Sequence, residues 1–97
     1  MIKKIEDLGS RAIVHTEYVD HISLTESERV YGATTYVAHG HYIYHELPSG
    51  RLGDQVCEGL ALRGPTMMVN KDETVGVAIA RSVEAAHGYR PNLETSE

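Results

Sequence analysis

The sequence predicts an α+β domain, in which a small antiparallel sheet of four or five strands carries a C-terminal helix packed on one face. Short segments with alternating or β-branched patterns fill the first two thirds of the chain, and apolar residues recur at helical spacing near the C-terminus. A chain of 97 residues has room for one hydrophobic core. We therefore expect a single domain over residues 1–90, followed by a flexible acidic tail over residues 91–97.

The N-terminal segment has the spacing of a short helix. Ile2, Ile5 and Leu8 recur every three residues, and Gly9 follows where a helix can end. We therefore expect one or two helical turns before the sheet begins.

Four segments have the pattern of strands. In the first of them, Ala12 and Val14 share one parity and His15 has the other, which predicts a strand with one face toward solvent. Glycine and proline separate the segments, and we expect a break or bulge near Gly32 and Gly40 and a turn at Pro48-Ser49-Gly50 with Gly53-Asp54. The four segments are residues 11–22, 29–38, 41–47 and 56–62, and residues 66–69 can supply a fifth strand.

The clearest predicted element is a helix over residues 71–87. Asn70 and Glu73 have the spacing of a capping box, and His87-Gly88 ends the helical pattern. Gly76 lies inside the helix at a cost of about 1 kcal/mol relative to alanine, so we expect a close approach to another backbone there. The residues expected to face the sheet are Val75, Ala78, Ile79, Val83 and Ala86.

Charge and composition exclude several classes of protein. The chain has 14 carboxylates and nine scattered Lys and Arg, for a formal charge of -5, so direct binding to nucleic acid is not expected. Cys57 is the only cysteine and cannot form an intramolecular disulfide. The sequence contains neither a signal peptide nor an apolar run long enough to cross a membrane. We expect a cytoplasmic protein that makes no membrane contact.

Ionisable side chains crowd together in residues 39–46. In a strand, His39 and His41 would share a face about 6.6 Å apart, a spacing from which two imidazoles can reach one metal ion. The pattern of these histidines followed by Glu46 resembles the first metal motif of the cupins, which are small β-barrel proteins that hold a divalent ion. The resemblance implies His39, His41 and Glu46 as ligands, and the second cupin motif has no counterpart in this chain. Two other interpretations are half-exposed strand residues without a ligand and acid–base catalysis by histidine.

A second group of ionisable residues is acidic. Four carboxylates lie between Arg11 and Arg29 without a Lys or Arg among them: Glu17, Asp20, Glu26 and Glu28. Such residues can serve solubility alone, or they can meet the Arg and Lys of a basic partner in place of phosphates. In size and charge the chain resembles small acidic proteins of phages and mobile elements, including anti-CRISPR inhibitors. This resemblance implies a nucleic-acid mimic that blocks a basic nucleic-acid-binding complex.

We expect a non-enzymatic binding or inhibitory protein that needs no cofactor and acts by contact with a basic protein or nucleic-acid-binding complex. Its expected contact residues are the four carboxylates above, with Tyr42 and Tyr44 as aromatic anchors. One alternative is a cupin-like metal-binding protein or small enzyme centred on His39, His41 and Glu46. Another is a homo-oligomeric structural subunit, because the sheet edges and the off-face Val77 favour a homodimer.

Overall fold

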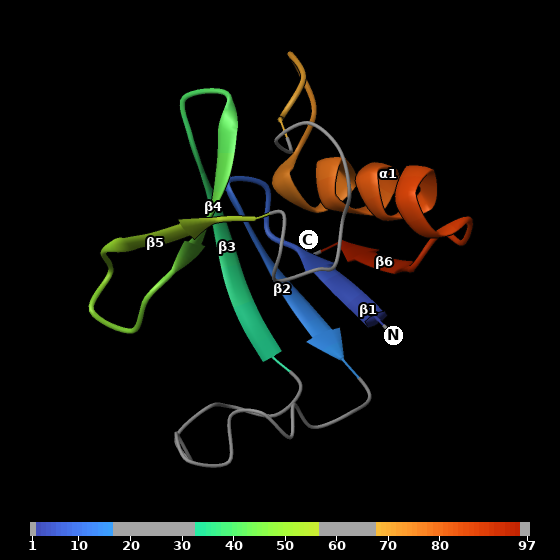
Figure 1. Cartoon of the computed structure of the whole chain (residues 1–97), viewed down its shortest axis with the longest axis horizontal. Helices are drawn as coiled ribbons and strands as arrows, with labels where there is room; N and C mark the ends of the chain where they lie inside the picture. Colours follow the sequence, from blue (N-terminus) through green and yellow to red (C-terminus); the bar gives the residue numbers. More distant parts are fainter. Residues whose placement is uncertain (1, 17–32, 57–67, 96–97) are drawn as a thin grey trace.

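The computed structural model describes residues 2–16, 33–56 and 68–95, which form a six-stranded sheet with one helix on one face (Figure 1). The predicted combination of a sheet and a helix packed on it is therefore confirmed. Along the chain the elements are β1 (Ile2–Asp7), β2 (Arg11–Thr16), β3 (Ala33–His39), β4 (Tyr42–Glu46), β5 (Leu52–Gln55), α1 (Val75–His87) and β6 (Asn92–Thr95).

The sheet is mixed rather than antiparallel, with the strand order β5-β4-β3-β2-β1-β6. Strands β1 to β5 pair antiparallel with their neighbours, whereas β6 runs parallel to β1. The predicted sheet of four or five antiparallel strands was therefore too small and lacked the parallel pair. Residues 92–95, which we assigned to a flexible tail, form β6 because the chain returns from α1 to the open edge of β1. Only Leu93 of this strand is half-buried, so its sequence carries little strand pattern.

The predicted N-terminal helix is wrong, because Ile2–Asp7 form β1. The pairing of β1 with β2 shifts register between Ile2 and Lys4, and this irregularity changes the alternation of side chains. Ile2 and Ile5 are consequently both buried despite their spacing of three. Gly9 has a φ of 87° in the turn between β1 and β2, where a left-handed conformation favours glycine.

The remaining strands agree with the predictions in part. Ala12 and Val14 of β2 are buried as expected, and β4 lies within the segment predicted over residues 41–47. Strand β3 ends at His39, one residue beyond the segment predicted over residues 29–38. The break expected near Gly40 is a tight turn with a φ of 67°. The turn expected at Pro48-Ser49-Gly50 is present, and the Gly50 N–H donates to the Leu47 carbonyl over 2.8 Å. Gly53-Asp54, expected in the same turn, belong instead to β5. The predicted strand residues 17–22, 29–32, 57–62 and 66–67 lie outside the described residues.

Helix α1 begins four residues later than predicted. Asp72 has a φ of 67°, which a right-handed helix cannot include, and Thr74 is the N-cap that accepts a hydrogen bond from the Val77 N–H. The Asn70–Glu73 contact exists, but it closes the turn before the helix: the Asn70 N–H donates to Glu73 Oε1 over 3.0 Å. The helix ends as predicted, with Gly88 in the left-handed region.

The hydrophobic core lies between α1 and the sheet. Of the predicted helix face, Ala86 is exposed because it lies in the last turn, and the other four residues are buried. Tyr36 and Ile43 reach the same core from β3 and β4. The fully or nearly buried core residues are Ile2, Ile5, Ala12, Val14, Tyr36, Ile43, Val56, Val75, Ala78, Ile79, Ala80 and Val83.

Candidate functional site

The four predicted acidic contact residues lie outside the described residues. They are Glu17, Asp20, Glu26 and Glu28, all within residues 17–32. Their role as contact residues therefore stays a prediction from the sequence.

The two predicted aromatic anchors lie on β4 and differ in exposure. Tyr42 is 41 % exposed, whereas Tyr44 is half-buried. The register of β3 and β4 pairs Tyr44 with Val37 and Tyr42 with His39. The rings of His39 and Tyr44 pack edge to face, with their centroids 6.2 Å apart. The structure thus gathers the two tyrosines with His39 on the face of the sheet that lies away from α1.

The residues of the cupin-like pattern are not gathered into one site. Strand β3 ends at His39, and Gly40-His41 makes the turn into β4, so the two histidines do not share one strand. Glu46 lies at the far end of β4, where its Oε2 atom is 2.9 Å from Arg11 Nε. Within residues 2–16, 33–56 and 68–95, no group of three or more His, Cys, Asp or Glu is placed to hold a metal ion.

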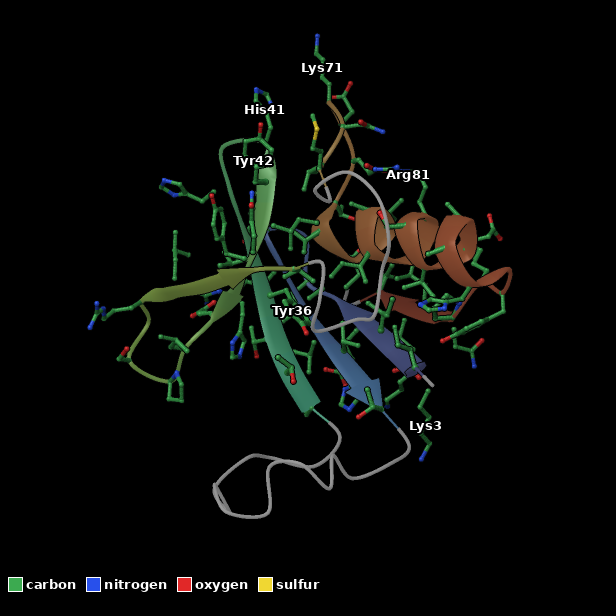
Figure 2. All side chains as sticks on the ribbon, in the orientation of Figure 1. Lys3, Tyr36, His41, Tyr42, Lys71 and Arg81 are labelled. Carbon is green, nitrogen blue, oxygen red and sulfur yellow. The ribbon has the colours of Figure 1, made fainter. Side chains whose placement is uncertain are left out.

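An exposed apolar patch lies where Met68 pairs with β4. Met68 and Tyr42 form an isolated antiparallel bridge, and each side chain is more than 40 % exposed. The Val69 N–H donates to the His41 carbonyl over 2.9 Å, which holds this segment beside the hairpin. Figure 2 shows Tyr42 at the same end of the molecule as His41 and Lys71. We call Tyr42 and Met68 the Tyr42–Met68 patch.

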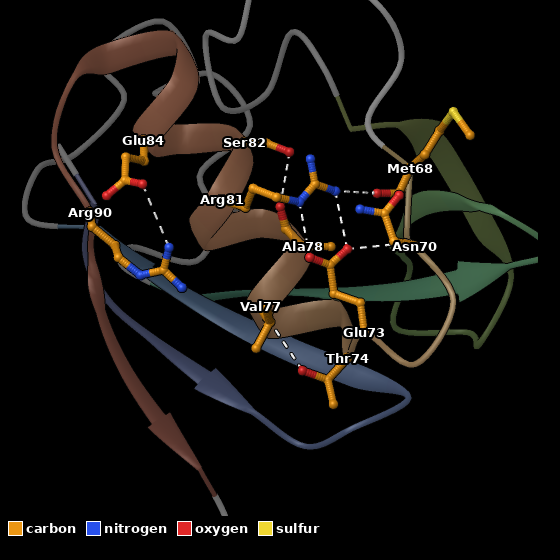
Figure 3. Close-up of polar contacts among 10 residues, drawn as sticks. All are labelled: Met68, Asn70, Glu73, Thr74, Val77, Ala78, Arg81, Ser82, Glu84 and Arg90. Carbon is orange, nitrogen blue, oxygen red and sulfur yellow. Dashed lines mark hydrogen bonds and ion pairs between the residues drawn. The ribbon is translucent and has the colours of Figure 1, made fainter.

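An arginine of α1 bonds the backbone of Met68. Arg81 binds Glu73 through two contacts, Nε to Oε2 at 2.9 Å and Nη2 to Oε1 at 3.1 Å. Arg81 Nη2 also donates to the Met68 carbonyl over 2.9 Å, so one guanidinium joins both residues (Figure 3). The hydrogen bond from Arg81 is the main reason that the pKa of Glu73 is lowered, and the same bond raises the pKa of Arg81. The sequence does not reveal this network, because the capping-box spacing of Asn70 and Glu73 predicts that Glu73 lies within the helix.

The face of the sheet away from α1, here called the outer face, combines apolar and charged side chains. Strand register places three rows of aligned residues on it: Glu6 with Ile13 and Thr35, Lys4 with His15 and Ala33, and Arg11 with Val37 and Tyr44. Their opposite-parity neighbours include the buried Ala12, Val14 and Tyr36 of the core.

Ion pairs lie at both sides of the outer face. Arg11 reaches Glu46 across β3, and on the other side His15 Nε2 is 3.6 Å from Glu6 Oε1. Lys4 Nζ lies 4.0 Å from the same Glu6 oxygen and 3.5 Å from a Glu94 oxygen on β6. The charges of the outer face are therefore mixed and largely paired.

The buried carboxylate of Asp7 has a structural role. Its Oδ1 atom accepts hydrogen bonds from the Gly9 N–H at 3.0 Å and the Gly76 N–H at 3.3 Å, and the Thr74 hydroxyl donates to Oδ2. Asp7 therefore ties the first turn of α1 to the turn between β1 and β2. No sequence motif links Asp7 to Thr74 and Gly76, because these two residues lie 67 and 69 positions away from it.

Comparison with known proteins finds no protein-family model, curated protein or solved structure that matches the chain. In the part of the chain that the structure describes, no helix is long and apolar enough to cross a membrane.

Proposed function

We propose that this chain is a non-enzymatic binding protein that acts by contact with a basic protein, in the manner of a nucleic-acid mimic. The observation that carries the proposal is the uneven distribution of charge along the chain. Residues 2–16, 33–56 and 68–95 hold eight carboxylates and seven Lys and Arg, for a net charge of -1. Residues 17–32 hold four carboxylates and one Arg, for a net charge of -3.

The carboxylates of the described residues are largely engaged within the domain. Asp7 accepts hydrogen bonds from its own chain. Five further carboxylates lie beside a Lys or an Arg: Glu6, Glu46, Glu73, Glu84 and Glu94. Carboxylates that are already paired offer little attraction to a partner, whereas an uncompensated group attracts Arg and Lys. The charge excess of residues 17–32 therefore supports Glu17, Asp20, Glu26 and Glu28 as the contact residues.

Tyr42 is the aromatic residue that we propose as an anchor for the same partner. It is exposed beside Met68, and tyrosine and methionine are both enriched at protein interfaces. Tyr44 is half-buried on the outer face, so its role in this contact is the smaller of the two.

The proposal is tested by charge reversal with a matched control. The immobilised chain captures proteins from extract of its native cell at physiological salt, and mass spectrometry identifies them. The test variant carries three reversals in the acidic segment: Glu17→Lys, Glu26→Lys and Glu28→Lys. The control makes the same change in net charge at exposed positions of the described domain: Asp72→Lys, Glu84→Lys and Glu94→Lys.

We expect a basic protein that binds the wild type and the control but not the test variant. Added DNA or RNA should compete with the chain for the purified partner, because both would occupy the same basic surface. Retention of the partner by the test variant would contradict the proposal. Equal loss from both variants would also contradict it, because net charge alone would then account for the binding.

A further inference from the structure

We propose that the outer face of the sheet is an interface between two copies of this chain, an inference that does not depend on the proposed function. Helix α1 is the only helix among the described residues, and it packs on the opposite face, as Figure 1 shows. In the same residues no strand packs extensively on the outer face, because the strands in extensive contact are neighbours within the sheet.

The centre of the outer face is suited to burial. Ile13, Val37 and Tyr44 lie on three adjacent strands, and each is only half-buried. Apolar side chains of this kind gain free energy when a second sheet removes them from water, and sheets that pack face to face do so through such residues. A small domain gains the most, because its own core is limited.

The charges around this centre favour a second copy over a partner of one sign. Two cations, Arg11 and Lys4, accompany two carboxylates, Glu46 and Glu6. In a two-fold dimer each patch meets itself, so a stable interface needs both signs on the same surface. A strongly acidic or strongly basic partner would meet repulsion from half of these groups.

Two polar atoms at the sides of the face, His15 Nε2 and Glu46 Oε2, are shielded from solvent. Neither makes an aligned hydrogen bond with residues 2–16, 33–56 or 68–95. Arg11 Nε is 2.9 Å from Glu46 Oε2, so this contact is an ion pair by distance without hydrogen-bond geometry. A small rearrangement on dimerisation would give both atoms partners from the second copy.

The area required also favours the outer face over the other exposed features. A stable interface takes about 800 Å² from each partner, which is about an eighth of the 6599 Å² accessible surface of the chain. The Tyr42–Met68 patch has two exposed side chains, and the edge strands β5 and β6 have four residues each. The pairing of β5 with β4 is also irregular, which disfavours extension of the sheet from that edge.

Sedimentation equilibrium of the purified chain tests the proposal, with circular dichroism to confirm that each variant folds. The wild type should have the mass of a dimer at micromolar concentration. Val37→Arg should give a monomer, because it places a charge at the centre of the interface. Ala86→Arg, on the exposed end of α1, is the control and should remain a dimer.

A mixing experiment separates contact between copies from contact within one copy. At the Arg11–Glu46 pair, Arg11→Glu leaves two carboxylates and Glu46→Arg leaves two arginines. Two copies of the same variant should therefore repel each other, so each variant alone should be monomeric. An equimolar mixture should form a heterodimer, because the two altered faces then have opposite charge. A monomeric wild type, or a dimer that survives both Val37→Arg and Arg11→Glu, would overturn the proposal.

Discussion

The carboxylate of Asp7 and the backbone of Gly76 are in direct contact at the start of α1. The Gly76 N–H donates to Asp7 Oδ1 over 3.3 Å, and a Cβ atom at position 76 would lie 2.5 Å from the Asp7 Cβ atom. Glycine is therefore required here by the closeness of strand and helix. This contact joins residues 69 positions apart and fixes how α1 lies on β1.

Replacing Gly76 by alanine should destabilise the domain. Helix propensity alone would favour alanine by about 1 kcal/mol, but the added methyl group would overlap Asp7, which is buried and cannot easily move. We expect the overlap to dominate, with a net loss of about 2 kcal/mol in the free energy of unfolding measured in urea. Ala85→Gly, at an exposed helix position, is the control for propensity and should cost about 1 kcal/mol. A stabilised Gly76→Ala variant would contradict this account.

Removal of the Asp7 carboxylate should cost more than removal of the helix cap. Asp7→Ala leaves the Gly9 and Gly76 N–H groups and the Thr74 hydroxyl without their acceptor, and we expect a loss of about 3 kcal/mol. Thr74→Ala removes one capping oxygen from the Val77 N–H and one donor to Asp7, for a loss of about 1 kcal/mol. Thermal and urea unfolding of the two variants measure the order, and the reverse order would show that Asp7 is not the main link.

The helix face and its C-terminal end could be predicted because both depend on local signals. Four of the five predicted face residues are buried, and Gly88 caps the last turn. The first residue of the helix could not be predicted in the same way. The spacing of Asn70 and Glu73 is typical of a capping box, but in this chain the two residues close a turn before the helix, in which Asp72 has a positive φ. Local spacing of this kind is compatible with two structures, and the contact of Thr74 with Asp7 favours the later start.

The strands at the ends of the chain could not be predicted, because their signals are not local. The register shift in β1 buries both Ile2 and Ile5, so a strand has the spacing of a helix. Strand β6 is formed by its pairing with β1, which is distant in the sequence. For the candidate sites, Tyr42 is exposed, and its role as a contact residue stays a prediction. The turn at Gly40 separates His39 from His41, a separation that a spacing of two residues does not reveal.

The pair of Glu73 and Arg81 should stabilise the domain in a pH-dependent way. Arg81 lowers the pKa of Glu73 below its ordinary value of 4.5, so this contribution is complete above that pH and is lost as the pH falls through the lower folded-state value. Because Arg81 is well exposed, we expect Arg81→Gln to cost at most about 1 kcal/mol at neutral pH. Urea unfolding should show the difference from wild type shrinking in acid, whereas a difference of constant size would contradict the ion-pair explanation.

A control for this pair is Glu84→Gln. Glu84 lies 3.7 Å from Arg90, and both side chains are about half exposed, so this contact should contribute little. We expect unfolding free energies close to wild type at neutral pH. A loss as large as that of Arg81→Gln would contradict this account, because an exposed ion pair would then contribute as much as the contacts of Arg81 with Glu73 and the Met68 carbonyl.

Ionisation of Tyr36 should destabilise the domain in alkaline solution. Burial in the core raises the pKa of Tyr36 from 10.0 to about 12, with a smaller opposing effect from its hydrogen bond with Thr34. The folded state therefore holds the phenol proton more tightly than the unfolded state. Its contribution is fully present below pH 10 and is lost as the pH rises toward about 12. Two pKa units correspond to a loss of roughly 2 to 3 kcal/mol over this interval.

Tyr36→Phe tests this prediction, because phenylalanine keeps the ring in the core and cannot ionise. Urea unfolding of the variant should show a flatter decline in stability above pH 10 than the wild type shows. Tyrosinate absorbance should also lose the component that titrates near pH 12. Tyr42→Phe, at an exposed position, is the matched control and should keep the alkaline decline of the wild type. If Tyr36→Phe declined as steeply as Tyr42→Phe, a different group would be responsible for the alkaline unfolding.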